Sequence, residues 1–261
     1  MDGNRTCFEQ AGQGPDVVLI HGLGLSHAMW RWVAPQLAEH HRLLVYDLLG
    51  HGASARPDGP YSLGDFVDQL YDLVNELRLA PFALVGFSLG GLIAQAFTLA
   101  HPRRVACLAV LHAAFDRSAA ERAAIMARVD LAETAGPAAT VEQALERWFT
   151  PDFARRRPDV LDRVRAWVLG NEAASFAAAY RVLATADAEL APAIAAIECP
   201  ALVITGGEDH GNSPDMAARM ANRMQNAHCR ILPGLRHMAL AEDPDAVLAE
   251  LLPFLDRCAA H

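Results

Sequence analysis

The sequence predicts an α/β protein in which a mostly parallel sheet is flanked by helices. Two observations support this prediction. Short runs of β-branched and leucine-rich sequence, which end near glycine or aspartate, alternate along the chain with longer segments of helical period. The chain also has 261 residues, of which 52% are hydrophobic and 20% charged, so it is long and apolar enough to bury a large core.

Six apolar runs are the expected strands, at residues 17–20, 43–47, 82–87, 105–111, 201–205 and 229–232. Between them, the segment 63–79 places apolar residues three and four positions apart, as an amphipathic helix does. We expect further helices at 29–39, 89–100, 214–224 and 244–255.

One long stretch, 116–192, interrupts this alternation. It contains no strand pattern, and alanine, arginine and leucine recur in it at helical spacing. Gly136-Pro137, Pro151 and Pro158 would divide it into several short helices. We therefore predict a core made of residues 1–115 and 193–261, interrupted by an inserted helical block at 116–192.

The charge balance argues against nucleic acid as a partner. The chain carries 22 basic and 31 acidic residues, for a formal net charge of −9, whereas binding to a phosphate backbone needs a positive face. The one short basic run, Arg155 to Arg157, is interpreted as a solvated surface stretch.

Cysteine spacing and hydropathy indicate a cytoplasmic protein without a metal site. The five cysteines are odd in number, widely separated and never in a CxxC pair, so neither a zinc site nor a disulfide framework is expected. No uncharged apolar span is long enough for a membrane helix. Residues 1–10 contain the charged Asp2, Arg5 and Glu9 and lack the apolar run of a secretory leader.

The sharpest chemical feature is the segment Gly86-Phe87-Ser88-Leu89-Gly90-Gly91, which follows an expected strand and opens an expected helix. A GxSxG pattern in this context predicts a turn so tight that its flanking positions must lack side chains. The serine hydroxyl is then held out at the carboxyl edge of the sheet. Ser88 is therefore the candidate nucleophile.

A serine hydroxyl is a weak nucleophile at neutral pH, so a histidine base and an acid that orients it are required. Each should follow a later strand, at the same edge of the sheet. The strand 201–205 leads into a polar turn that makes Asp209 the leading candidate acid, with Glu208 and Asp116 as alternatives. His237 follows the last expected strand and is the candidate base.

The oxyanion formed in acyl transfer needs two donors that already point at it. His21-Gly22-Leu23-Gly24 ends the first expected strand, and its glycines allow a close approach of the backbone. The backbone amides of Leu23 and Leu89 are the candidate oxyanion hole. His21 is interpreted as a residue that fixes this loop.

Together these motifs resemble the α/β-hydrolase fold superfamily, in particular HGLG at 21–24, the segment 47–54, GFSLGG at 86–91, GGED at 206–209 and the late His237. The pattern spans nearly the whole chain. The resemblance implies an α/β-hydrolase fold in which the block 116–192, inserted after the sixth strand of the fold, forms a lid over the site.

Within the superfamily, HGLGLSHAMW at 21–30 and ERWFTP at 146–151 are similar to 3-oxoadipate enol-lactonases and aminoacrylate hydrolases. Haloalkane dehalogenases and epoxide hydrolases carry aspartate where Ser88 stands, which disfavours them. Carbon–carbon hydrolases of meta-cleavage pathways usually have asparagine at the position of Phe87 and stay open, as do cofactor-free perhydrolases. A small-molecule receptor that keeps the fold is a further alternative, which the intact Ser88, Asp209 and His237 disfavour.

We therefore expect a serine hydrolase that cleaves a carboxylic ester or lactone of a small molecule, with an enol-lactone as one candidate, without metal or organic cofactor. If the substrate carries a carboxylate, Arg147 and the run Arg155 to Arg157 are the candidates to meet it, since arginine presents a planar fork of donors. Phe87 and Trp148 are candidates to line the pocket. The apolar Leu23, Phe87 and Leu89 around the turn, with Met29 and Trp30 nearby in the sequence, predict a mainly hydrophobic pocket. Neither nucleic acid nor a membrane is an expected partner, and a homodimer is a hypothesis.

Overall fold

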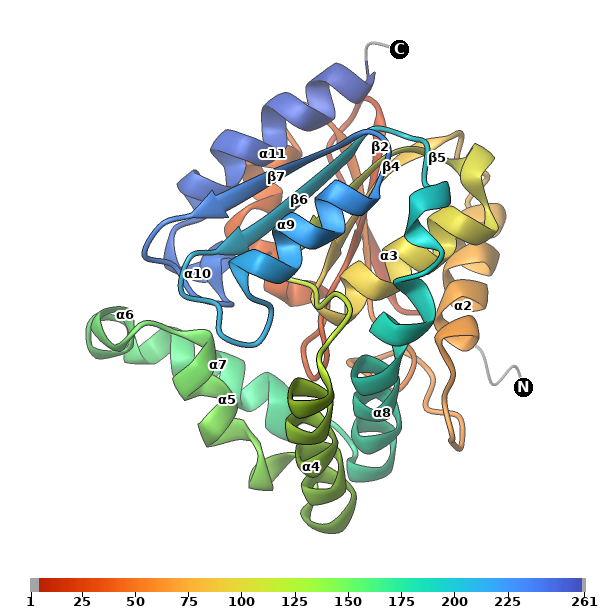
Figure 1. Cartoon of the computed structure of the whole chain (residues 1–261). Helices are drawn as coiled ribbons and strands as arrows, with labels where there is room; N and C mark the ends of the chain where they lie inside the picture. The colour runs from red at the N-terminus through yellow and green to blue at the C-terminus, as the bar shows by residue number, and fades with distance from the viewer. Residues whose placement is uncertain (1–4, 260–261) are drawn as a thin grey trace.

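The computed structural model describes residues 5–259 and is built on a seven-stranded sheet (Figure 1). The strand order is β1-β3-β2-β4-β5-β6-β7, and only β1 runs antiparallel to its neighbour. The strands are β1 Phe8–Ala11, β2 Asp16–Ile20, β3 Arg42–Tyr46, β4 Phe82–Phe87, β5 Val105–Leu111, β6 Ala201–Gly206 and β7 Ala227–Leu232. The parallel strands bring their carboxyl ends, and the loops that follow them, to one edge of the sheet.

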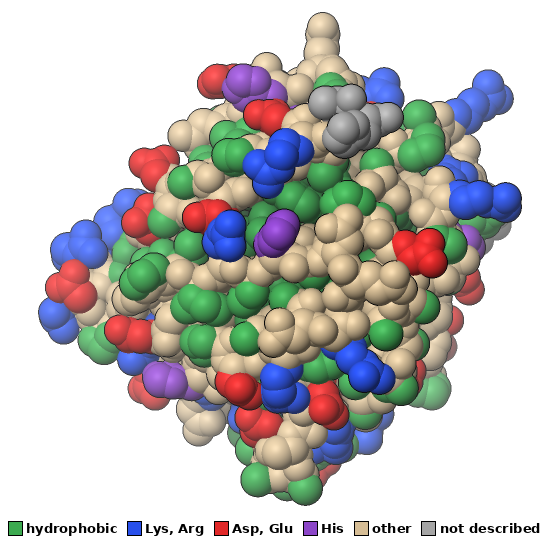
Figure 2. All heavy atoms as spheres, turned by 45° about the horizontal axis from the view of Figure 1, so that its top comes forward, with side chains coloured by type: hydrophobic (Ala, Val, Ile, Leu, Met, Phe, Trp, Pro, Cys, Tyr) green, Lys and Arg blue, Asp and Glu red, His purple; other side chains and the backbone are tan. Residues whose placement is uncertain are grey.

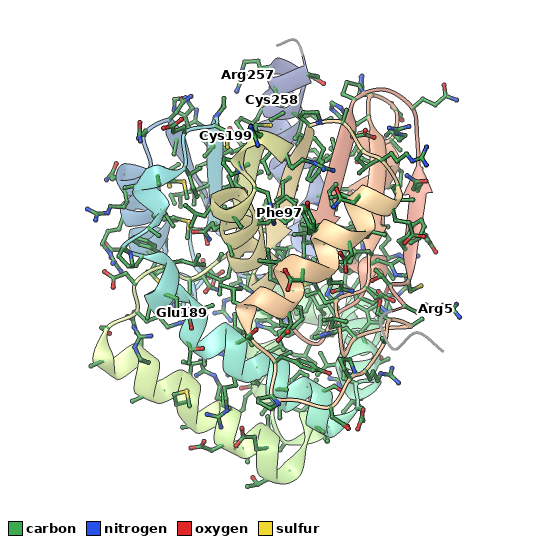
Figure 3. The ribbon with its side chains drawn as sticks, turned by 90° about the vertical axis from the view of Figure 1, so that its right-hand side faces the viewer. Arg5, Phe97, Glu189, Cys199, Arg257 and Cys258 are labelled. Carbon is green, nitrogen blue, oxygen red and sulfur yellow. The ribbon has the colours of Figure 1, made fainter. Side chains whose placement is uncertain are left out.

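Helices cover both faces of this sheet (Figures 1 and 3). On one face α3 packs on β4 and β5, α2 packs on α3, and α9 packs on β6 and β7, while α11 covers the other face. These helices are α2 Leu63–Glu76, α3 Leu89–Ala100, α9 Pro214–Arg223 and α11 Pro244–Ala259. Phe97, labelled in Figure 3, is fully buried, with its ring centroid 6.0 Å from that of Phe82 on β4.

Shorter helical segments connect these elements. They are η1 His27–Trp32, α1 Ala34–Leu37, η2 Pro102–Arg104, η3 Pro137–Ala139, η4 Ile194–Ala196 and α10 Ala239–Glu242. In Figure 3, Cys199 and Cys258 lie toward the end of the molecule opposite the inserted helices.

The segment between β5 and β6 is helical in the structure, and it lies beyond one edge of the sheet (Figure 1). It contains α4 Ala119–Ala135, α5 Val141–Trp148, α6 Pro151–Arg156, α7 Pro158–Leu169 and α8 Ala173–Leu190. Gly136 ends α4, and Pro151 and Pro158 begin α6 and α7, as the sequence predicted. Among the described strands, the block follows the fifth strand, β5. The prediction placed it after the sixth strand as strands are numbered in the family fold.

The structure departs from three local predictions. Strand β1 was missed because its four residues are all exposed, so they carry no apolar run. The helix expected at 29–39 is divided into η1 and α1, since Pro35 has no N–H and is tolerated only in the first turn of a helix. The expected strand at 43–47 also ends one residue early, because Asp47 leaves the sheet to bind the turn that follows. The predicted core limits 1–4 and 260–261 lie outside the described residues.

The surface carries both signs of charge. On the face in Figure 2, arginine side chains are interspersed with aspartate and glutamate. No helix among the described residues is long and apolar enough to cross a membrane.

Candidate active site

Ser88 stands at the turn between β4 and α3. Its φ of 54° lies in the left-handed region, where a residue with a side chain is strained, and its N–H donates to the carbonyl of Leu111 on β5. The flanking glycines make this turn possible. A Cβ on Gly86 would lie 2.1 Å from the carbonyl oxygen of Gly90, and one on Gly90 would lie 2.3 Å from that of Ile20. The sequence therefore folds into the tight turn that its GxSxG pattern predicts.

Asp209 and His237 meet at the same edge of the sheet, from the loops after β6 and β7. The His237 Nδ1 lies 2.8 Å from the Asp209 Oδ2 and donates to it, since an ionised carboxylate only accepts. The Asp209 Oδ1 accepts from the N–H groups of Gly211 and Asn212. Burial alone would raise the pKa of Asp209, but the neighbouring imidazole of His237 and the hydrogen bonds of the histidines hold that pKa well below its usual range.

The two alternative acids lie elsewhere. Glu208 is exposed, with its Oε2 3.7 Å from the Nε of Arg236. Asp116 is also exposed, and its Oδ2 lies 3.5 Å from an Arg219 guanidinium nitrogen. Of the three candidate acids, the structure therefore brings Asp209 to His237.

A pocket lies between this edge of the sheet and the inserted helices. Ser88 and His237 both line it, together with Gly22, Leu23 and Phe87. The inserted helices supply the other wall, with Ile125 and Arg128 from α4, Arg147 and Trp148 from α5, and Tyr180 and Leu183 from α8. The rings of Phe87 and Trp148 lie 4.9 and 5.8 Å from the His237 ring. The structure therefore brings Ser88, His237, Leu23, Phe87, Arg147 and Trp148 together at one cavity.

The loop after β2 holds the predicted oxyanion donor. Leu23 lines the pocket, and its N–H has no hydrogen-bond acceptor within residues 5–259. Leu89 is the first residue of α3, so its N–H has no partner inside the helix. The next residue in the loop, Gly24, is held at both ends. Its N–H donates to the His51 Nε2, and its carbonyl accepts from the Asn171 amide between α7 and α8.

Two buried histidines fix this loop through nitrogens that must stay unprotonated. The His21 Nε2 accepts from the N–H of Leu48, just as the His51 Nε2 accepts from Gly24. Each Nδ1 donates to a carbonyl, that of Gly22 for His21 and that of Leu49 for His51. Burial lowers the pKa of His21 to about 3, helped by the neighbouring His51, and lowers the pKa of His51 to about 4.

We therefore expect stability to fall as the pH drops below 6.5. The unfolded chain then takes up protons at His21 and His51, whereas the folded protein does not until about pH 4 and below. Each histidine costs about 1.4 kcal/mol for each pH unit, so the two together cost up to about 3 kcal/mol per unit. Urea unfolding at pH 7.5, 6.5, 5.5 and 5.0 measures this loss. His51→Gln, which keeps an acceptor, should lower the slope by the share of one histidine, about 1.4 kcal/mol per pH unit. A flat profile between pH 6.5 and 5 would contradict the prediction.

Three arginines reach the pocket, and they are not equivalent. Arg117 is buried against Asp187, with an Nη to Oδ1 distance of 2.8 Å. Arg128 donates through its Nε to the Tyr180 hydroxyl, and neither Arg128 nor Arg147 forms an ion pair with a carboxylate among the described residues. Burial, followed by the nearby charge of Arg128, lowers the pKa of Arg147. Arg128 and Arg147 thus bring two positive charges to the pocket that no ion pair among residues 5–259 compensates.

The loop that carries His237 is tied to the inserted helices. The N–H of Met238 donates to the carbonyl of Trp148 at 2.9 Å. The Glu242 carboxylate accepts from the N–H of Thr150 with one oxygen and from the N–H of Arg236 with the other. The position of His237 therefore depends on the end of α5 as well as on β7.

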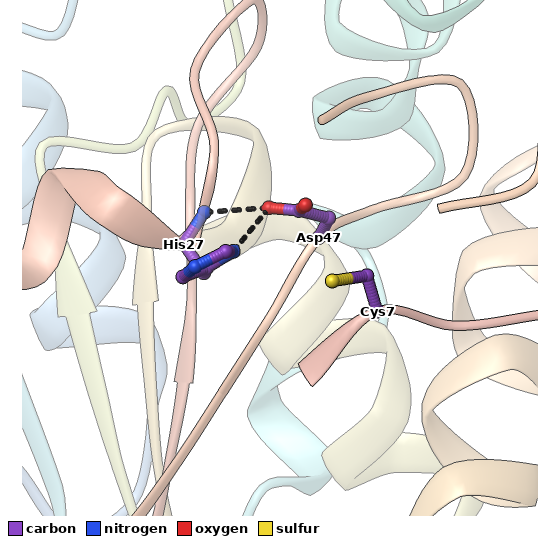
Figure 4. A group of neighbouring side chains, drawn as sticks. All are labelled: Cys7, His27 and Asp47. Carbon is purple, nitrogen blue, oxygen red and sulfur yellow. Dashed lines mark hydrogen bonds and ion pairs between the residues drawn. The ribbon is translucent and has the colours of Figure 1, made fainter. Parts of the chain in front are cut away.

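Among residues 5–259, two groups of side chains bring three possible metal-ligand atoms within 4.8 Å of one another, although the sequence spacing predicted no metal site. One is His112, Asp209 and His237. The other is Cys7, His27 and Asp47 (Figure 4), where the His27 N–H and Nδ1 both bind the Asp47 Oδ1. The Asp47 Oδ2 accepts from the N–H of Ala53. Because these protein donors occupy the carboxylate, we interpret the second group as an anchor for the turn after β3.

Some expectations about the pocket were wrong. Met29 and Trp30 belong to η1 and are buried in the core, and they are not among the residues that line the pocket. The lining is also more polar than the apolar pocket expected, because Arg117, Arg128 and Arg147 reach it. The run Arg155 to Arg157 is exposed on and just after α6, where its arginines pair with Asp152 and Asp159, as its interpretation as a surface stretch predicts.

Comparison with known proteins agrees with this fold. A family model described as "Alpha/beta hydrolase family" matches residues 17–251. The (E)-2-((N-methylformamido)methylene)succinate hydrolase of Acinetobacter baylyi is 30% identical over 258 residues, which cover 98% of this chain and 96% of that protein. The 3-oxoadipate enol-lactonase 2 of the same organism is 27% identical, over 93% of this chain and 89% of its own. The crystal structure of the enol-lactonase from Burkholderia xenovorans LB400 superposes with a TM-score of 0.91 at 29% identity, over 98% of each chain.

Proposed function

Since the chain belongs to the alpha/beta hydrolase family and is a hydrolase, we propose that it cleaves a carboxylic ester or lactone of a small molecule through an acyl-enzyme on Ser88. The observation that carries this proposal is the pairing of His237 with Asp209 at the pocket where Ser88 stands on its strained turn. A histidine whose Nδ1 donates to a buried carboxylate presents its Nε2 as a base.

In the proposed reaction the His237 Nε2 takes the Ser88 proton as Oγ attacks the carbonyl carbon. The carbonyl oxygen becomes an oxyanion, which accepts hydrogen bonds from the N–H groups of Leu23 and Leu89. The intermediate collapses, and the leaving alcohol or enol takes the proton from His237. A water molecule, activated by the same histidine, then attacks the acyl-enzyme and releases the acid and the Ser88 hydroxyl. These steps use no metal or organic cofactor.

We propose that the substrate carries a carboxylate. Arg128 and Arg147 supply uncompensated positive charge at the pocket, and a guanidinium binds a carboxylate through two parallel hydrogen bonds. The net charge of −9 would not attract an anion from a distance, so this recognition has to be local. The names of two relatives, a hydrolase of a substituted succinate and an enol-lactonase of an oxoadipate, are consistent with a small acidic substrate.

We propose further that the block 116–192 acts as the lid of this site. Its helices α4, α5 and α8 supply one wall of the pocket, including both uncompensated arginines. The lid would thus select the substrate, while the loops of the sheet carry out the chemistry. The predicted homodimer stays a prediction.

We expect the enzyme to prefer monomethyl succinate over methyl butyrate, because these esters differ at the acyl terminus by a carboxylate in place of a methyl group. An enol-lactone with a carboxylate side arm should also be hydrolysed. Arg147→Met and Arg128→Met should each lower kcat/KM for monomethyl succinate by about 10- to 100-fold, since a hydrogen bond to a charged group contributes about 1.5–3 kcal/mol. Titration of the released acid measures the rate of hydrolysis of each of these substrates without a chromophore.

Arg155→Met, at an exposed position, is the matched control, and it should leave kcat/KM for both esters unchanged. Methyl butyrate should be hydrolysed equally well by the wild type and the two pocket variants. An equal loss on both esters would indicate a structural role for the arginines and would contradict carboxylate recognition. If the enzyme hydrolysed no ester or lactone but cleaved a vinylogous diketone, the proposed ester cleavage would be refuted and the reaction would be carbon–carbon bond cleavage.

A further inference from the structure

A second histidine, beside His237, contacts the candidate acid. His112 follows β5 directly, is fully buried, and places its Nδ1 3.1 Å from the Asp209 Oδ2. This is the same oxygen that accepts from His237. The two imidazole rings lie 5.6 Å apart at an angle of 82°, and both lie near the Phe87 ring.

The surroundings of His112 fix which nitrogen carries the proton. Nδ1 faces a carboxylate, which only accepts, so a proton on Nδ1 makes a hydrogen bond. The Nε2 is buried and has no hydrogen-bond partner within residues 5–259. A proton on Nε2 instead would leave a buried donor unsatisfied and would turn a lone pair of Nδ1 toward the anion. His112 is therefore neutral with its proton on Nδ1, in agreement with the lowering of its pKa by burial.

The backbone is distorted to aim this ring. His112 has a φ of 52°, in the left-handed region, and its N–H donates to the carbonyl of Ile204 on β6 at 2.7 Å. The Thr205 hydroxyl, 3.5 Å from the His112 Nδ1, donates to the carbonyl of Asn212. A strained position is retained only where the surrounding contacts hold it, and such positions concentrate at functional sites.

We infer that His112 is a positioning residue for the proposed reaction, which fixes the Asp209 carboxylate by donating to the oxygen that His237 uses. With Gly211 and Asn212 on Oδ1 and the two imidazoles on Oδ2, the carboxylate accepts four hydrogen bonds. It then cannot rotate away from His237 when Ser88 gives up its proton. The inference rests on the proposed function, in which Asp209 orients the base.

The first test is the tautomer of His112 in the wild-type protein. Long-range ¹H–¹⁵N NMR spectra of the ¹⁵N-histidine-labelled chain distinguish the two neutral tautomers, and the signal lost in His112→Asn assigns the residue. We expect a neutral ring with a deshielded Nδ1 proton. A proton on Nε2 would overturn the inference. This readout needs no substrate, so a failure of the inference can be distinguished from a failure of the proposed activity. The proposed activity would fail if Ser88→Ala hydrolysed esters as well as the wild type does.

The second test compares two variants. Asparagine places an amide donor near the position of Nδ1 and tolerates a left-handed backbone, whereas leucine fills space without donating. On one ester, kcat of His112→Leu should fall about 10-fold or more below that of His112→Asn, with similar KM values. If His112 only fills the core, leucine should serve as well as asparagine, and equal kcat values would overturn the inference. Urea unfolding of both variants separates a loss of folded protein from a loss of kcat.

Discussion

Replacing Ser88 with alanine is expected to lower kcat by about 10⁴- to 10⁶-fold, the range found when a serine nucleophile is removed from a hydrolase. The variant keeps a Cβ at the strained position, so the turn between β4 and α3 and the pocket should persist. The hydroxyl is lost, and with it the acyl-enzyme. Steady-state hydrolysis of monomethyl succinate, with 4-nitrophenyl butyrate as a chromogenic ester, measures the effect.

Ser62→Ala is the matched control, since it removes the same atom from the exposed N-cap of α2. It should cost about 1 kcal/mol of stability and leave kcat unchanged. A fluorophosphonate should phosphonylate the wild type and Ser62→Ala, with loss of HF, so that their mass rises by that of the phosphonyl group, whereas the mass of Ser88→Ala should not change. If Ser88→Ala kept a tenth of the activity, the acyl-enzyme mechanism would be refuted and chemistry by a directly activated water would take its place.

Asp209→Asn is expected to lower kcat by about 10⁴-fold, as the corresponding change does in serine proteases. The N–H groups of Gly211 and Asn212 would hold the amide oxygen at the position of Oδ1. The amide NH₂ would then face the Nδ1 atoms of His112 and His237, donor against donor. His237 would have to move its proton to Nε2, where it could no longer take the proton of Ser88.

The alternative acids supply the controls for this prediction. Glu208→Gln and Asp116→Asn change exposed carboxylates that pair with Arg236 and Arg219. Both variants should keep kcat within about twofold of the wild type, since surface ion pairs contribute about 0–1 kcal/mol. A large loss in either one, with Asp209→Asn active, would assign the role of the acid to that residue instead.

The sequence predicted the parts of the fold and of the candidate site that depend on local patterns. Ser88 is recognisable because its turn requires Gly86 and Gly90 at fixed spacing. Asp209 and His237 could be chosen because each follows a predicted strand, and parallel strands bring such loops to one edge. The divisions of the helical block were readable as well, since Gly136, Pro151 and Pro158 act on the backbone where they stand.

What the sequence did not predict depends on contacts across long separations. Arg128 and Tyr180 meet in the pocket although 52 residues separate them, and Asn171 reaches Gly24 across 147 residues. His112 looks like one of eleven histidines until the fold places it 97 residues away against Asp209. A histidine directly after a buried strand, at the edge where the other loops meet, was the available signal. Strand β1 gave no such signal, because its residues are all exposed.

The bonds from the helical block to Gly24 and to the His237 loop limit how such enzymes can exchange parts. Asn171 binds the loop that carries Leu23, and the chain near Trp148 binds Met238 and Glu242. A chimera that takes residues 116–192 from a relative would therefore inherit a new substrate preference only if the donor segment brings equivalents of these bonds. Recombination at 116 and 192 without them would separate specificity from turnover, giving proteins that fold and bind but react slowly.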